Sequence, residues 1–148
     1  MSVLITNETT KEVFHIAKSI ARENYNAALG AAHLLQAVLH SSFGLKEFLV
    51  GIDKDPGYLF EWAEVRIEEY AKTAHLPEQI AQDESVARIL EEADDIRSKL
   101  GLDEITPLCL LSAIAKPNVA YTVSPFLSIY LLLIKKKSSL TGKSNKAI

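Results

Sequence analysis

The chain has 148 residues, of which 48% are hydrophobic and 24% are charged; this composition is typical of one globular domain and excludes an intrinsically disordered chain. Five of its 16 basic side chains lie in residues 135–148, so residues 1–134 hold 11 basic and 19 acidic side chains. Such an acidic body argues against a nucleic-acid-binding surface, which needs clustered positive charge.

The first segments predict two helices separated by a short turn. The first helix is predicted over residues 10–24, where Thr9 and Glu12 have the spacing of a capping box. The second is predicted over residues 31–40. Both carry apolar residues at helical spacing, which indicates a buried face on each. These residues are Val13, Ala17 and Ile20 in the first helix and Leu34, Leu35, Val38 and Leu39 in the second.

Two further helices are predicted before the middle of the chain. A short one follows Gly44, and a longer one covers residues 56–72. Asp55 and Pro56 are typical of a helix start, because a carboxylate caps free N–H groups and proline has no N–H to leave unpaired. No stretch shows the alternation and hairpin turns of β-strands. The sequence therefore predicts an all-α fold.

An internal repeat organises the chain. Residues 83–115 repeat residues 7–39 at a constant shift of 76 positions, without a gap. The matched positions are mainly apolar and helically spaced, as two copies of one helical unit would be. Thr106 and Pro107 give the second copy its own helix start. Identical pairs are Glu8/Glu84, Ala17/Ala93, Ile20/Ile96, Leu34/Leu110, Leu35/Leu111 and Ala37/Ala113.

These features predict a compact bundle of two tandem, pseudo-symmetric helical repeats. We place both in one domain of residues 1–118, with the first repeat over about residues 7–72 and the second over about 83–117. Residues 73–82 link the repeats.

The C-terminal segment, residues 119–148, is atypical for the repeat and rich in lysine. Its apolar run, residues 126–134, is shorter than the roughly 20 residues of a membrane span. We expect a buried or interfacial segment and no membrane span, with a membrane-associated tail as the alternative. Cys109 is the single cysteine, so no internal disulfide forms, and the chain start lacks a signal-peptide pattern. Together these features predict a cytoplasmic protein.

Residues 30–39 carry a family resemblance through the sequence Gly-Ala-Ala-His-Leu-Leu-Gln-Ala-Val-Leu. Together with the preceding turn and the repeat offset, they resemble the Clp repeat domain, the N-terminal domain of Clp-type AAA+ unfoldases, over about residues 5–117. The resemblance implies a domain that recognises protein partners and has no catalytic activity of its own. ATP would be hydrolysed by AAA+ modules, joined to this domain in cis or bound in trans.

A narrower resemblance lies in residues 22–26, Arg-Glu-Asn-Tyr-Asn, and in the long fourth helix. Both look most like the type VI secretion ATPase, often called ClpV, which implies docking of a helix of the contractile sheath. Two features depart from the family pattern. Cys109 stands where the first repeat has His33, and the final helices of the second repeat are not recognisable after Asn118.

No pattern indicates a catalytic residue, a cofactor or a metal site. Residues 141–144, Thr-Gly-Lys-Ser, lack the upstream glycine of a phosphate loop, because Lys137 occupies its position. We expect Cys109 to be a buried, inert thiol, and His33 to make a satisfied polar contact near the start of its helix. The acidic residues 91–95 splay around a helix, which predicts a solvated face or a rim for a basic partner.

Positions that are apolar in only one repeat are candidates for partner recognition. Ile16 is matched by Glu92, and Ala21 by Arg97. We predict an apolar groove beside the first helix, where an amphipathic helix or apolar segment of a protein would dock. Its predicted lining residues are Leu4, Ile5, Phe14 and Ile16. The alternative for the first two is a hydrophobic staple at the helix entry.

The sequence thus predicts a substrate- or partner-recognition domain of a Clp-type ATPase. Three alternatives stay open: a general Clp chaperone or protease N-terminal domain, a free-standing adaptor that binds unfolded substrates, and a small helical enzyme that uses Cys109 and His33.

Overall fold

The computed structural model describes residues 7–122 and 124–133. Its main elements are helical, which confirms the predicted all-α class, and a two-stranded parallel pairing joins the two repeats. The helices are α1 (Glu8–Glu23), α2 (Ala31–Val38), α3 (Leu45–Gly51), α4 (Pro56–Glu68), α5 (Glu84–Leu100) and α6 (Pro107–Ala115), with the 3-10 turn η1 (Ser41–Phe43) and the strands β1 (Ala28–Leu29) and β2 (Ala81–Gln82). Residues 127–133 are also helical.

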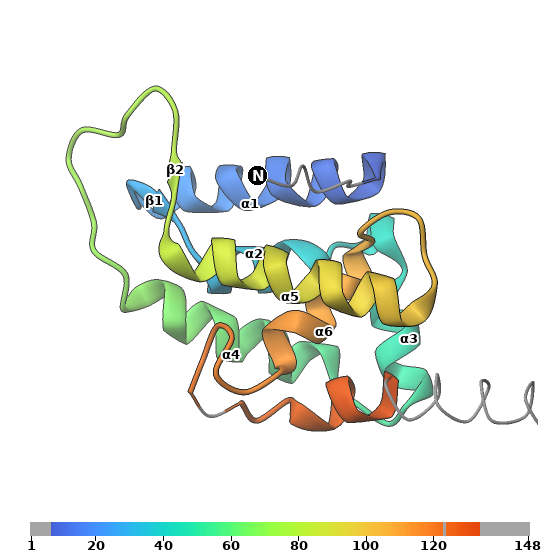
Figure 1. The fold of residues 1–148 in the computed structure, drawn as a ribbon. Coiled ribbons are helices and arrows are strands. Elements are labelled where there is room, and N and C mark those ends of the chain that lie inside the picture. Colours follow the sequence, from blue (N-terminus) through green and yellow to red (C-terminus); the bar gives the residue numbers. More distant parts are fainter. Residues whose placement is uncertain (1–6, 123, 134–148) are drawn as a thin grey trace, which may run out of the picture.

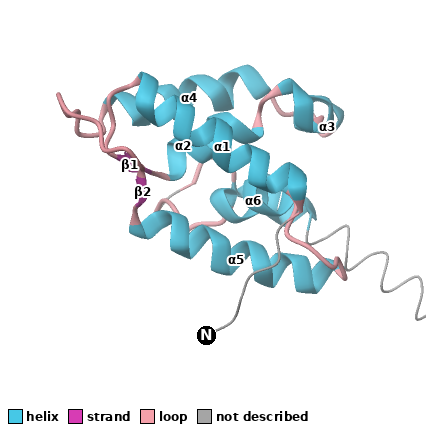
Figure 2. Cartoon of the chain, turned by 90° about the horizontal axis from the view of Figure 1, so that it is seen from above, coloured by secondary structure: helices cyan, strands magenta, loops and turns pink. Residues whose placement is uncertain are grey.

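The helices α2 and α6 form the centre of the bundle. Each belongs to one repeat and they pack against each other, while α1 and α4 cover α2 and α5 covers α6. Figure 1 shows α1 above α5, both running across the view, and Figure 2 shows α4 and α5 on opposite flanks. Every residue of α2 is buried, which explains its nearly continuous apolar sequence.

Backbone hydrogen bonds reproduce the repeat symmetry. The N–H of Asp83 donates to the carbonyl of Leu29 (2.9 Å), and the N–H of Asn7 donates to the carbonyl of Ile105 (3.2 Å). These pairs are exchanged by the 76-residue shift, so each repeat holds the start of the other repeat's first helix. The two halves are therefore related by approximate two-fold symmetry.

The start of α1 differs from the prediction. The Asn7 side chain caps the helix by accepting the N–H of Thr10 at 2.7 Å, so Thr9 and Glu12 do not form the predicted capping box. The reason is tertiary: the Thr10 side chain is buried and its hydroxyl donates to the Ile105 carbonyl at 2.7 Å. Anchoring Thr10 inside the bundle puts it within the first turn and leaves the cap position to Asn7.

Two helices are shorter than predicted. Helix α4 ends at Glu68, because the chain tightens there and turns Tyr70 inward, where its hydroxyl accepts the Ala32 N–H at 3.0 Å. Helix α2 ends at Val38, and the His40 side chain instead caps η1. Both ends are set by contacts with other segments, which a local periodicity does not contain.

A buried polar cluster fixes the start of α2. Nδ1 of the His33 ring accepts a hydrogen bond from the Gly30 N–H. Nε2 of the same ring lies 2.9 Å from Asn26 Oδ1. Gly30 is needed for space, because a Cβ there would lie 2.7 Å from the Tyr70 hydroxyl and 2.8 Å from the Asp83 carboxylate. Gly30 has no side chain to cap the helix, and the His33 ring instead pairs with the free Gly30 N–H at the helix start. This contact confirms the polar role predicted for His33.

The second repeat solves the same problem with different residues. Thr106 accepts the Cys109 N–H with its hydroxyl oxygen, so the cap side chain comes from the residue before the helix. Cys109 then needs no polar side chain and is fully buried, as predicted. This exchange of capping partners explains why the histidine is not duplicated.

The hydrophobic core continues past residue 118. Phe126, Ile129 and Leu133 are buried, and the Trp62 ring of α4 meets the rings of Tyr121 and Phe126 edge-on. The expectation of a buried or interfacial segment is thus met for its described part. Within the described residues, no helix is both long and apolar enough to cross a bilayer. The lysines of residues 135–148 and the sequence of residues 141–144 lie outside the described part.

Candidate functional site

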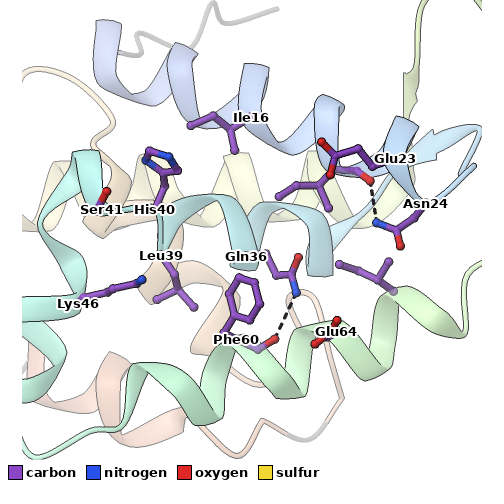
Figure 3. A pocket seen from close by; sticks show the side chains of 12 residues that line it. Ile16, Glu23, Asn24, Gln36, Leu39, His40, Ser41, Lys46, Phe60 and Glu64 are labelled. Carbon is purple, nitrogen blue, oxygen red and sulfur yellow. Dashed lines mark hydrogen bonds between the residues drawn. The ribbon is translucent and has the colours of Figure 1, made fainter.

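A groove of about 470 Å³ opens beside α1, in the first repeat. It lies between α1, α2 and α4, and η1 and α3 bound one of its ends (Figure 3). Its lining residues are Ile16, Ile20, Glu23, Asn24, Gln36, Leu39, His40, Ser41, Lys46, Phe60, Glu64 and Ile67. We call this site the α1 groove.

Five of the twelve residues that line the groove are apolar. Ile16 and Ile20 lie one helical turn apart on α1, beside the stripe of that helix that enters the core. Both are only partly buried, and Phe60 of α4 leaves 43% of its surface exposed. An apolar surface that remains accessible between packed helices is suited to the side chains of a bound polypeptide.

A buried amide lies among these apolar side chains. Gln36 is only 8% exposed, and its Nε2 donates to the Phe60 carbonyl at 3.3 Å. Because a carbonyl can only accept, the amide nitrogen must face Phe60 and the amide oxygen must face away from it. Figure 3 shows this oxygen directed into the space between α1 and α4.

The polar side chains divide between the two ends of the α1 groove. Glu23, Asn24 and Glu64 gather at one end, while His40, Ser41 and Lys46 lie at the other (Figure 3). Glu23, Glu64 and Lys46 take part in none of the ion pairs among the described residues. The groove therefore has an acidic end and a basic end.

Of the predicted site residues, the structure brings Ile16 to the groove wall. Phe14 is half-buried against the core and does not line the groove. Leu4 and Ile5 lie outside the described residues. Ala21, singled out because the second repeat has arginine there, is fully buried in the core, since a small side chain lets α1 approach its neighbours.

Sequence reasoning missed the groove residues outside α1. Gln36, Phe60 and Ile67 lie on α2 and α4 and enter the site only when these helices pack against each other. Gln36 was an available signal, because it is the one polar residue of α2 besides His33 and a buried amide usually needs hydrogen-bond partners.

The corresponding surface of the second repeat has different chemistry. Glu92 and Lys116 occupy the positions of Ile16 and His40, and they form an ion pair at 3.0 Å. Tyr130 lies 5.4 Å from the Lys116 ammonium. Ile96, the counterpart of Ile20, is fully buried. The first repeat thus leaves Ile16 and Ile20 accessible. At the matching positions, the second repeat has an ion-paired Glu92 and a buried Ile96.

The other chemical candidates do not form a reactive site. The Cys109 thiol is buried, and its Sγ accepts a hydrogen bond from the Thr106 hydroxyl at 3.3 Å. In the acidic segment 91–95, Glu91 and Asp95 are exposed, as a solvated face requires. Glu92 departs from this prediction, because its side chain is only 15% exposed and pairs with Lys116. Within the part of the chain that the structure describes, no three potential ligands gather into a metal site.

The fold and sequence together define the class of protein. Residues 5–123 match the family described as the Clp repeat (R) N-terminal domain. The match covers most of the chain, so the chain belongs to this family, whose domains bind protein substrates and partners of Clp ATPases. A comparison with curated proteins yields no match.

Solved structures share the fold at low sequence identity. A chain from structural investigations of a malarial protein secretion system has a TM-score of 0.71 and 18% identity, over 89% of this chain and 94% of that chain. The Hsp104 N-terminal domain from Candida albicans has a TM-score of 0.67 and 15% identity, over 90% of this chain and 82% of that chain. Both are similar in fold to the present chain.

Proposed function

We propose that this domain recognises a polypeptide segment in the α1 groove and presents it to a Clp-type ATPase module, in cis or in trans. The observation that carries the proposal is the accessible apolar wall of Ile16, Ile20 and Phe60 in a domain of the Clp repeat family. An amphipathic helix would dock with apolar anchors at i, i+3 or i+4, and i+7.

A single groove of this kind does not need to bind tightly. An assembly that displays several such domains raises the effective concentration of the bound segment without new contacts. Weak individual sites also release the segment quickly, which favours its transfer to the motor.

For the identity of the partner, we propose a helix of the contractile sheath of type VI secretion. The support is the resemblance of residues 22–26 to ClpV, and these residues include Glu23 and Asn24 of the groove. The alternative partner is an unfolded substrate of a general Clp chaperone or protease, or of an adaptor. The fold of this chain, which is similar to that of the Hsp104 N-terminal domain, is equally compatible with this alternative.

A substitution in the groove wall tests the proposal. Ile16→Glu places a charge on the apolar wall and should abolish peptide binding, because a docked apolar anchor would desolvate that charge. The control is Val50→Glu, at a position 62% exposed and outside the groove, which should bind as the wild type does. Binding is measured by fluorescence anisotropy, and folding by circular dichroism.

Two probes separate the partner classes. One is a set of overlapping peptides that tile the subunits of a type VI sheath; the other is reduced, carboxymethylated α-lactalbumin, which is permanently unfolded. Binding to one sheath helix that Ile16→Glu abolishes would support the secretion role, and binding to the unfolded protein alone would support the chaperone role. Binding of either probe that Ile16→Glu leaves unchanged would contradict recognition in the α1 groove.

A further inference from the structure

The acidic end of the α1 groove concentrates hydrogen-bond acceptors around an apolar floor. Glu23 of α1 and Glu64 of α4 are exposed and come from different helices on the two sides of the groove. The Asn24 amide nitrogen donates to the Ile20 carbonyl at 2.8 Å, so the Asn24 amide oxygen is its remaining polar atom. Three side chains thus present oxygen atoms at this end.

Gln36 adds an acceptor at greater depth. Its nitrogen is held by the Phe60 carbonyl, and within the described residues no donor reaches its oxygen. Although Gln36 as a whole is only 8% exposed, this oxygen is not among the buried atoms of the described residues and opens into the groove. A donor from a bound segment can therefore pair with it.

We propose that the α1 groove selects segments in which a lysine or arginine is flanked by apolar anchors, with the cation seated between Glu23 and Glu64 and donating to Gln36. This inference rests on the proposed function and specifies its ligand. Lysine and arginine carry several donors and no acceptor, which matches a cluster of oxygen atoms. An asparagine or glutamine would supply a donor to Gln36 but would leave both carboxylates uncompensated.

The opposite end of the groove limits where the cation binds. Lys46 and the donors of Ser41 lie there, so a second cation would meet like charge. The basic residue is therefore confined to the Glu23 and Glu64 end, and the apolar anchors extend from it along Ile20, Ile16 and Phe60. This polarity also sets the direction of the bound segment.

Selection from a phage-displayed library of random peptides tests this ligand class. Peptides selected on the immobilised domain should be enriched in lysine or arginine next to apolar residues. On the double variant E23K/E64K, the enrichment should change to aspartate or glutamate. For a peptide selected on the wild type, E23Q/E64Q should weaken binding by about tenfold or more, as expected for loss of charge-assisted hydrogen bonds.

The control addresses the acidic body of the domain, which attracts basic peptides in a general way. E12K/E91K changes the net charge by the same amount at exposed positions outside the groove. This variant should retain the basic preference. The proposal would be overturned if the selected peptides showed no preference for basic residues, if that preference survived E23K/E64K, or if E12K/E91K removed it equally. Recognition in the groove would remain intact in each case. A library that yields no peptide sensitive to Ile16→Glu would instead contradict the proposed function and this inference together.

Discussion

At the scale of single residues, His33 shows how burial assigns a histidine a structural role. Its Nδ1 accepts the Gly30 N–H, so the proton of the neutral ring lies on Nε2 and is donated to Asn26 Oδ1. Burial lowers the pKa of His33 to about 4, although the charge of Asp83 acts in the opposite direction. The ring is therefore neutral near pH 7 and links the start of α2 to the preceding turn.

This depressed pKa predicts acid sensitivity of the fold. In the unfolded chain the imidazole takes up a proton near pH 6.5, whereas in the folded chain it does so only near pH 4. The free energy of unfolding should fall as pH drops from 6.5 to 4, by up to about 1.4 kcal/mol per pH unit. Urea unfolding at a series of pH values measures this slope. His33→Gln should flatten it, and His75→Gln, at an exposed position, should not.

At the scale of elements, the cap predicted for α1, Thr9, was wrong, because Asn7 caps the helix. Asn7 and Thr9 are both residue types that cap helices, and their sequence context does not choose between them. The choice comes from Thr10, whose hydroxyl bonds to the Ile105 carbonyl in the other repeat. A contact across 95 positions of sequence thus decides where a local structure begins.

A pair of alanine substitutions tests this assignment. Asn7→Ala should lower the free energy of unfolding by about 1 kcal/mol, because it removes the side-chain acceptor of the Thr10 N–H. Thr9→Ala, at an exposed position, should change it by less than about 0.5 kcal/mol. Chemical denaturation measures both. If Thr9→Ala were the more damaging change, Thr9 and not Asn7 would cap the helix in solution.

At the scale of the whole molecule, the segment after α6 completes the core. Ile129 is 1% exposed, whereas Leu131, two positions later in the same helical segment, is 52% exposed. The described part of the apolar run, residues 126–133, therefore has one buried face and exposed leucines. The domain boundary at residue 118 stays a prediction, and the buried side chains beyond it provide the means to test it.

Substitutions in this segment test its share of the stability. Ile129→Ala should destabilise the protein by about 2 to 5 kcal/mol, because it leaves a cavity in the core. Leu131→Ala should change stability by less than about 0.5 kcal/mol, because that side chain lies on the surface. Thermal and urea unfolding measure both values. Equal, small effects would show that the segment is not an integral part of the fold.

The sequence by itself determined the helices, their repeat and the residues that face the core. Apolar spacing and capping residues act over one or two turns, so the starts of α2, α5 and α6 follow from them closely. The 76-residue repeat adds pseudo-symmetry, because two copies of one unit bury the same positions, such as Ala17 and Ala93.

Only the tertiary structure decided the site. The α1 groove is built from α1, α2 and α4, so Ile16, Gln36 and Phe60 meet only through helix packing that no local pattern encodes. Packing also buried Ala21 and left Ile20 accessible on the same helix. Periodicity reports which face of a helix is apolar, but which part of that face stays uncovered depends on the volume and placement of its neighbours.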